Sequence, residues 1–292
     1  MATATRSPID QQSVWFITGC STGFGRELAG QLLARGNKVV VTARDPKSLS
    51  AFANMKNALV LTLDVTNPGE IAASVQAAEA KFGHIDVLVN NAGIGYFAAV
   101  EEGEDSEIRR MFDINLFGLA ATTCAVLPGM RKRRHGFIVN FSSIGGLRSF
   151  PAIGWYNATK FAVEGLSEAL WQEVNPLGIQ VMLVEPSGFR TDWAGRSADE
   201  SKNQIADYAA TAGAGRAGVR AQSGQQAGDP VRAAAAIIKV VEGAEPPHRL
   251  LLGNNAYDGA IAKLNDLRTE FAKWEPVSRG ADFPADKSGK AA

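Results

Sequence analysis

The chain has few cysteines and no excess of charge of either sign. Cys20 and Cys124 are the two cysteines among 292 residues, and neither belongs to a Cys-x-x-Cys pair or a Cys/His cluster. A disulfide framework and a metal site are therefore not expected, and a reducing, cytoplasmic location is favoured. Lys plus Arg and Asp plus Glu both number 30, so the formal net charge is zero. This balance gives no indication of a nucleic acid or an anionic membrane as a partner.

Long hydrophobic runs are also lacking. No stretch of about 18 apolar residues occurs, so no membrane-spanning helix is expected. Residues 1–12 are polar, lack the apolar centre of a signal peptide and are expected to be flexible. Residues 278–292 are polar, with Gly, Pro and Lys, and are expected to form a flexible tail. The composition, 46% hydrophobic and 21% charged, allows a sizeable core and indicates a single domain over residues 13–277.

Short apolar runs alternate with longer helical patterns along the chain. This alternation is typical of βαβ units, and continuous apolar strands indicate a sheet covered on both faces. The sequence therefore predicts an α/β fold, a single Rossmann-type doubly wound parallel sheet of about seven strands. The predicted strands are Val14–Thr18, Lys38–Thr42, Leu59–Asp64, Asp86–Asn90, Gly136–Phe141, Gln180–Glu185 and Arg249–Leu252, and the predicted helices are Gly25–Arg35, Ile71–Phe82, Glu104–Met130, Trp155–Val174 and Pro230–Glu242.

One segment interrupts this rhythm. Residues 192–228 are rich in Ala, Gly, Ser, Gln and Asn and contain no clear strand. A long irregular insertion in a compact domain is usually functional or disordered. We interpret it as a substrate-loop insertion that forms a mobile lid, with an ordinary surface loop as the alternative.

A glycine-rich loop directly follows the first predicted strand. It reads Thr18-Gly19-Cys20-Ser21-Thr22-Gly23-Phe24-Gly25 and leads into a helix. Glycines let the backbone approach a pyrophosphate closely, and the helix N-terminus offers free N–H groups and a positive dipole end. The position between a strand and a helix predicts a dinucleotide site. A glycine turn without a ligand is the alternative.

The end of the second predicted strand bears on the choice between NAD and NADP. An acidic side chain there commonly holds the ribose 2′-hydroxyl of NAD, but this chain has Ala43 followed by Arg44. A guanidinium suits a 2′-phosphate through paired, charge-assisted hydrogen bonds. Asp45 could supply the acid after a shift of one residue. NADP(H) is therefore favoured, and NAD(H) remains possible.

Tyr156 and Lys160 lie four residues apart and hence on one face of a predicted helix. A tyrosine is a poor base at neutral pH, and a nearby ammonium is expected to lower its pKa. Ser143 stands at the carboxyl end of the fifth predicted strand, where functional groups gather in open α/β sheets. Together these residues indicate an acid/base site.

Further short segments follow along the chain, namely Asp64-Val65, Asn90-Asn91-Ala92-Gly93, Asn115, and Pro186-Ser187-Gly188 with Thr191. With the Thr18–Gly25 loop and with Ser143, Tyr156 and Lys160, they make the chain similar to the classical short-chain dehydrogenase/reductase family from about Val14 to Leu252, and Asn115, Ser143, Tyr156 and Lys160 match the catalytic tetrad of that family. Ser187 departs from the family pattern, in which glycine is commoner, and this leaves the local backbone path open.

The resemblance implies a role for each of these residues. Tyr156 would be the general acid in reduction and the base in oxidation, and Lys160 would lower its pKa and bind the nicotinamide ribose. Ser143 would hydrogen-bond the substrate oxygen, and Asn115 would hold a water in a proton relay. The expected cofactor contacts are Gly19, Ser21, Thr22, Gly23, Phe24, Gly25, Arg44, Asp64, Val65, Asn91, Ala92, Gly93, Tyr156, Lys160, Pro186, Gly188 and Thr191.

The function expected from these residues is an NADP(H)-dependent oxidoreductase that moves a hydride between nicotinamide and a carbonyl or secondary alcohol. Large apolar residues near the expected carbonyl site predict a lipophilic small-molecule substrate. The expected substrate contacts are Ser143, Tyr156, Tyr96, Phe97, Leu147, Phe150 and Trp193.

Three alternatives stay open at this point. The chain could be an NAD(H)-dependent enzyme, an epimerase or dehydratase of the same fold, or a non-catalytic NADP(H)-binding sensor or scaffold. The resemblance also implies a homodimer or homotetramer, formed by the helix Glu104–Met130 and by an apolar stripe within Glu164–Trp171.

Overall fold

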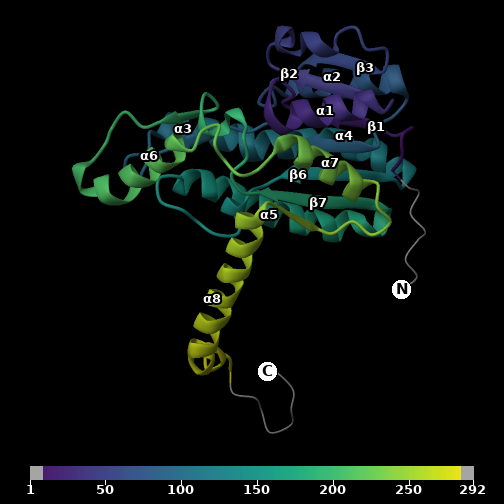
Figure 1. Ribbon diagram of the computed structural model, residues 1–292. Coiled ribbons are helices and arrows are strands. Elements are labelled where there is room, and N and C mark those ends of the chain that lie inside the picture. Colours follow the sequence, from purple (N-terminus) through teal and green to yellow (C-terminus); the bar gives the residue numbers. More distant parts are fainter. Residues whose placement is uncertain (1–8, 284–292) are drawn as a thin grey trace, which may run out of the picture.

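A parallel sheet forms the centre of the molecule (Figure 1). The structure is a computed structural model that describes residues 9–283. Its strand order is β3-β2-β1-β4-β6-β7-β9, and every pairing is parallel. This confirms the predicted Rossmann-type fold. The strands are β1 (Val14–Ile17), β2 (Lys38–Ala43), β3 (Ala58–Thr62), β4 (Val87–Asn90), β6 (Gly136–Phe141), β7 (Ile179–Pro186) and β9 (Arg249–Leu252).

Alternate residues of each strand face opposite helical layers, because side chains in a strand alternate in direction. In β1, Trp15 and Ile17 pack beneath α1 (Gly23–Ala34) and α7 (Pro230–Val241), whereas Phe16 belongs to the opposite cluster. Full burial of such side chains stabilises the fold by about 1.5–3 kcal/mol each. The second layer consists of α2 (Pro68–Phe82), α4 (Leu119–Arg133) and α5 (Gly154–Val174).

The strand order reverses between β1 and β4, and this topology locates the functional site. The chain runs outward from β1 to β3 on one side, then crosses to β4 and continues to β9 on the other. In open parallel sheets the crevice beyond the carboxyl ends of the strands at such a reversal receives ligands. The glycine loop follows β1, and residues 91–94 follow β4, so both border this crevice.

The helix expected over Glu104–Met130 is a composite. It consists of α3 (Asp105–Phe112), a π-helical turn η2 (Asp113–Gly118) and α4. The stretch Asp105–Arg133 is long and apolar enough to cross a membrane by length and composition. It packs against α2, α5, β4 and β6, and one such helix among the described residues is weak evidence for a membrane span.

Residues 192–228 carry regular structure, in contrast to the irregular loop expected there. Strand β8 (Ala198–Glu200) pairs with β5 (Gly95–Phe97), and α6 (Ala214–Ala221) follows. β8 has three residues, and α6 contains Gly215 and Gly218, so neither gives a strong periodic pattern. The shorter helical turns of the chain are η1 (Pro46–Phe52), η3 (Ile144–Gly146), η4 (Asn175–Leu177), η5 (Asp192–Ala194), η6 (Ala206–Tyr208) and η7 (Ala209–Gly213).

Both ends of the described region extend the domain beyond the predicted limits of 13–277. Ile9 is only 2% exposed and belongs to the core cluster around β1, so packing begins before residue 13. Helix α8 (Asn254–Arg279), which was not expected, continues past residue 277 and projects from the body (Figure 1). The rest of the segments expected to be flexible, residues 1–8 and 284–292, lies outside the described residues.

Candidate active site

A cavity of about 1300 Å³ opens at the carboxyl ends of the central strands, as the topology requires. Its wall combines the glycine loop after β1 with residues that follow β2, β4, β6 and β7. The volume slightly exceeds the range of about 300–1,000 Å³ that is usual for a single small-molecule site. It therefore has room for a dinucleotide and a second small molecule.

The glycine loop has the conformation that a phosphate site needs. Gly19 has a φ of +72°, and a Cβ there would lie 2.9 Å from Cα of Ala92. A Cβ on Gly25 would collide with the carbonyl oxygen of Gly19, so glycine lets α1 start directly against the loop. Thr22, the N-cap of α1, makes no capping bond through its side chain, which leaves the first amide groups of the helix for a ligand. The loop residues thus fit a pyrophosphate.

A hydrogen-bond network ties this loop to the end of β4. The side-chain amide of Asn91 donates to the carbonyl oxygens of Thr18 (2.9 Å) and Gly19 (2.8 Å). The backbone N–H groups of Asn91 and Ala92 both donate to Thr18 Oγ1 at 3.0 Å. Thr18 is buried and positions the two cavity-lining segments relative to each other. It was not among the expected site residues, although it opens the glycine motif.

The cavity extends past the end of β2. Ala43 closes this strand, and Arg44, Asp45 and Ser48 line the wall beside it. The Asp45 carboxylate accepts a hydrogen bond from Lys47 N at 2.9 Å and caps η1, so it already has a structural partner. Asp64 and Val65 line the same end.

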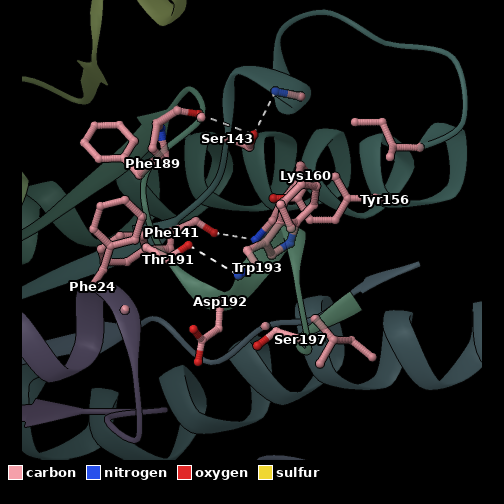
Figure 2. A pocket seen from close by; sticks show the side chains of 18 of the residues that line it. Phe24, Phe141, Ser143, Tyr156, Lys160, Phe189, Thr191, Asp192, Trp193 and Ser197 are labelled. Atoms are coloured by element: carbon pink, nitrogen blue, oxygen red, sulfur yellow. Dashed lines mark hydrogen bonds between the residues drawn. The ribbon is translucent and has the colours of Figure 1, made fainter. Parts of the chain in front are cut away.

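Tyr156, Lys160 and Ser143 meet on the opposite part of the wall (Figure 2). Tyr156 and Lys160 both lie on α5, and the Lys160 ammonium donates to the Phe141 carbonyl oxygen at 2.7 Å. Ser143 follows β6, and its Oγ accepts a hydrogen bond from Gly145 N at 3.0 Å. Ser143 Oγ also donates to the Pro186 carbonyl oxygen at 3.5 Å. The sequence prediction that these three side chains share one site agrees with this arrangement.

Burial shifts the pKa of both α5 residues. Desolvation raises the pKa of Tyr156 to about 12, and the hydrogen bond from Ser143 opposes this shift. Desolvation also lowers the pKa of Lys160 to about 8, and the charge of Glu164, one turn along α5, opposes it. The lowered tyrosine pKa expected from the sequence is therefore wrong for this structure, because the loss of solvation dominates.

Asn115 lies beside the cavity and does not line it. Its Oδ1 accepts from Ile94 N, and its Nδ2 donates to Ile94 O, both at 2.9 Å. Its amide also lies 3.3 Å from Thr159 Oγ1 on α5. The residue belongs to the π-helical turn η2, a feature that is frequent at functional sites. Asn115 thus joins the segment after β4 to α5, and Ile94 in turn lines the cavity.

The substrate wall differs in part from the expected set. Phe150 and Trp193 line the cavity, and the Trp193 ring lies 4.8 Å from the Tyr156 ring. Tyr96 and Phe97 do not line it, because β5 buries both behind the wall, in the same apolar cluster as Tyr156 and Trp193. Leu147 packs against Ile144, Ala256 and Ala260 instead. Wall residues that the sequence interpretation missed include Ile94, Ile144, Arg148, Ile153, Val219 and Asp258.

The remaining expected contacts follow β4 and β7. Ala92 and Gly93 line the cavity on one side, and Pro186, Gly188 and Thr191 line it on the other. Gly25 is set back against Gly19 and does not reach the wall. At Ser187, where the backbone path was open, the backbone N–H donates to Leu252 O at 3.0 Å, which anchors this segment to β9.

Comparison with known proteins identifies the family of this chain. Residues 13–202 match the model of the short chain dehydrogenase family. The chain is 37% identical over 268 residues to the oxidoreductase BOA17 of Botryotinia fuckeliana, covering 91% of this chain and 97% of the relative. It is 38% identical over 244 residues to a 3-ketodihydrosphingosine reductase of Bacteroides thetaiotaomicron, covering 83% and 88%.

Solved structures agree in fold and in sequence. A short-chain dehydrogenase from Streptomyces avermitilis superposes with a TM-score of 0.87 at 42% identity, covering 93% of this chain and all of that one. A short-chain dehydrogenase/reductase from Burkholderia phymatum, solved in complex with NAD, gives a TM-score of 0.76 at 25% identity, with 90% and 95% coverage. This chain therefore belongs to the short-chain dehydrogenase family and is an NAD(P)-dependent oxidoreductase that acts on CH–OH or C=O groups.

Proposed function

We propose that the protein is an NADP(H)-dependent reductase of lipophilic ketones or aldehydes, with the reverse oxidation of secondary alcohols as the same chemistry. The observation that carries this proposal is the shared cavity. The glycine loop and Arg44 border one part of it, and Ser143, Tyr156 and Lys160 border another. A bound dinucleotide and a carbonyl compound can therefore meet beside Tyr156.

The preference for NADP(H) rests on the end of β2. Arg44 lines the cavity, and its guanidinium has no carboxylate oxygen within 4.0 Å among residues 9–283. A dianionic 2′-phosphate would supply its partner through charge-assisted hydrogen bonds. Ala43 offers no acceptor for a ribose hydroxyl, and the Asp45 carboxylate caps η1. A solved serine dehydrogenase with NADP+ bound shares the fold at 26% identity, with a TM-score of 0.70, and covers 82% of this chain.

The proton chemistry follows from the pKa values. When bound, the nicotinamide supplies the hydride. Because the pKa of Tyr156 is about 12, its hydroxyl keeps its proton at neutral pH and can deliver it to the carbonyl oxygen. Ser143 can donate a second hydrogen bond to the same oxygen, and Lys160 below its pKa of about 8 provides a positive charge beside the developing phenolate.

The substrate class and the cellular location are inferred from the same structure. Phe150, Ile153, Trp193 and Val219 give the cavity an apolar wall beside Tyr156, which favours a lipophilic carbonyl compound over a sugar. Cys20 and Cys124 are both free thiols, as expected in a reducing compartment. We therefore propose a cytoplasmic enzyme.

The cofactor is tested by fluorescence titration of the protein with NADPH and with NADH. We expect NADPH to bind at least about tenfold more tightly, because one paired guanidinium–phosphate contact contributes about 1.5–3 kcal/mol. Arg44→Ala should remove most of this preference and leave NADH affinity nearly unchanged. A parent protein that prefers NADH would contradict the role of Arg44.

The acid/base role is tested by Tyr156→Phe, which retains the ring against Trp193. Its rate of NADPH oxidation with a panel of aryl and alkyl ketones should fall by about 10²–10⁴-fold. NADPH affinity should stay within about threefold of the parent, because the ring packing is kept. Ketone reduction by this variant at close to the parent rate would be incompatible with the proposed mechanism.

A further inference from the structure

The cationic side chains of the cavity wall differ in whether they have partners. Arg110 hydrogen-bonds Glu107 at 2.7 Å and Asp199 at 3.0 Å, and Arg196 donates to Asp192 at 2.6 Å. Lys160 belongs to the acid/base site. Among residues 9–283, the two other guanidiniums of the wall, Arg44 and Arg148, have no carboxylate oxygen within 4.0 Å. The proposed cofactor phosphate would pair with Arg44, whereas nothing described so far supplies an anion to Arg148.

Arg148 lies at the substrate part of the cavity. It lies two residues after the end of η3, and its backbone N–H donates to Ile144 O at 3.0 Å. It therefore belongs with the segment after β6 that carries Ser143, whereas Arg44 follows β2. β2 and β6 are separated by β1 and β4 in the sheet, which is three strand spacings or about 14 Å. The two unpaired cations thus flank the site on opposite sides.

The side chain of Arg148 is held in place by apolar contacts. Its guanidinium carbon lies 5.2 Å from the centroid of the Phe150 ring. At Gly259 on α8, a Cβ would lie 3.5 Å from Cδ and from one terminal nitrogen of Arg148. Stacking on a ring uses the face of the planar guanidinium, whereas carboxylates bind its N–H edge. The contact with Phe150 therefore positions the cation without using its donors.

The surroundings favour an anion over water as the partner. Arg148 is half-buried, and Ile144, Phe150 and Ile153 line the wall around it. A partly desolvated cation is costly unless a charged or hydrogen-bonding group pairs with it. Asp258 also lines the cavity, but its carboxylate forms no ion pair with Arg148 within 4.0 Å.

We propose that Arg148 binds the anionic end of the substrate, which is an apolar ketone or secondary alcohol that carries a carboxylate. The inference rests on the proposed function of the same site and adds the substrate class to it. The apolar wall holds the body of the molecule, Tyr156 and Ser143 hold its oxygen, and Arg148 holds its carboxylate.

The test compares a matched pair of substrates, an aryl ketone with a carboxylate on the ring and its methyl ester, at saturating NADPH. The parent enzyme should have the higher kcat/KM for the acid. Arg148→Gln should lower kcat/KM for the acid about tenfold more than for the ester, chiefly through KM, because a hydrogen bond to a charged group contributes about 1.5–3 kcal/mol. Arg148→Lys, which keeps the charge, should recover part of the loss.

A binding measurement separates this inference from the proposed function. The acid and the ester are titrated by tryptophan fluorescence into Tyr156→Phe with NADPH bound, and into the same protein with Arg148→Gln added, so no turnover is needed. If the acid binds more tightly than the ester, and if this difference disappears in the variant with Arg148→Gln, the inference is supported even if no ketone is reduced. Equal binding of acid and ester, or an equal loss of both in Arg148→Gln, would overturn it and leave the reductase proposal standing.

Discussion

Lys160 makes the pH dependence of catalysis predictable. Its pKa is lowered to about 8 by burial, so the ammonium is present below this pH and is lost as pH rises through it. Tyr156 keeps its proton over the same range, because its pKa is about 12. We therefore expect kcat/KM for ketone reduction to be constant near pH 6–7.5 and to fall about tenfold per pH unit well above pH 8, with a single ionisation.

The control for this assignment is Lys160→Arg, whose guanidinium stays protonated throughout this range. Its residual activity, although lower, should no longer fall between pH 8 and 10. The pH–rate profiles of the two proteins, measured with one ketone at saturating NADPH, provide the comparison. A descending limb near pH 8 that persists in Lys160→Arg would assign the ionisation to another group.

At the level of single residues, the sequence predicted the groups defined by short motifs. Ser143, Tyr156, Lys160 and Arg44 all line the cavity, because each stands at a fixed spacing from the end of a strand or on one helix face. The apolar contacts were harder to predict. Tyr96 and Phe97 are large and close in sequence to the site, but β5 buries both, and sequence gives no measure of which way a three-residue strand faces.

Packing between elements makes Gly118 a sensitive position. It ends the π-helical turn η2, and a Cβ there would lie 2.7 Å from Val65 Cγ2 and 2.8 Å from the Val65 carbonyl oxygen. Gly118→Ala should therefore push the helix away from the segment that follows β3. We expect a loss of about 1–3 kcal/mol in the free energy of unfolding, measured with urea, because overpacking a tight contact costs that much.

Gly30 in the middle of α1 is the matched control. A Cβ there would meet no atom within 4 Å. Gly30→Ala should thus stabilise the protein by about 0.5–1 kcal/mol through helix propensity alone. Since Val65 lines the cavity, NADPH affinity should fall in Gly118→Ala and not in Gly30→Ala. If Gly118→Ala is as stable as Gly30→Ala, Val65 can shift to accommodate the added Cβ, and the predicted overpacking is wrong.

Helices and strands with a regular pattern of apolar residues were predicted from the sequence, whereas elements without such a pattern were missed. The seven sheet strands and the helices between them follow from alternating apolar runs. α8 was missed because only Ala256 and Ala260 of its 26 residues are buried, so no apolar stripe marks a core-facing side. Within residues 192–228, α6 is held chiefly by polar contacts, such as those of the Arg220 guanidinium with the carbonyl oxygens of Ala194 and Ala198, which leave no periodic signal.

Among residues 9–283, exposed large apolar side chains gather in two regions, among other places. One lies on η2 and α5, which are in contact, and includes Phe117 (59% exposed) and Phe161 (45%). The other follows α8, where Phe271 and Trp274 are both more than half exposed. Large exposed apolar patches commonly mark interaction sites, including protein interfaces. Assembly could not be derived from the residues alone, since nothing in a single sequence states which face meets a partner.

We predict a homodimer or homotetramer in solution in which the face on η2 and α5 is buried. This face is favoured over α8 because η2 and α5 pack within the body of the molecule, whereas most of α8 projects beyond it (Figure 1). Phe117→Glu combined with Phe161→Glu should at least halve the mass measured by light scattering, because an unpaired buried carboxylate costs several kcal/mol. Trp274→Glu on α8 should leave the mass unchanged. Dissociation by Trp274→Glu alone would move the interface to α8, and a monomeric parent protein would refute the prediction for both faces.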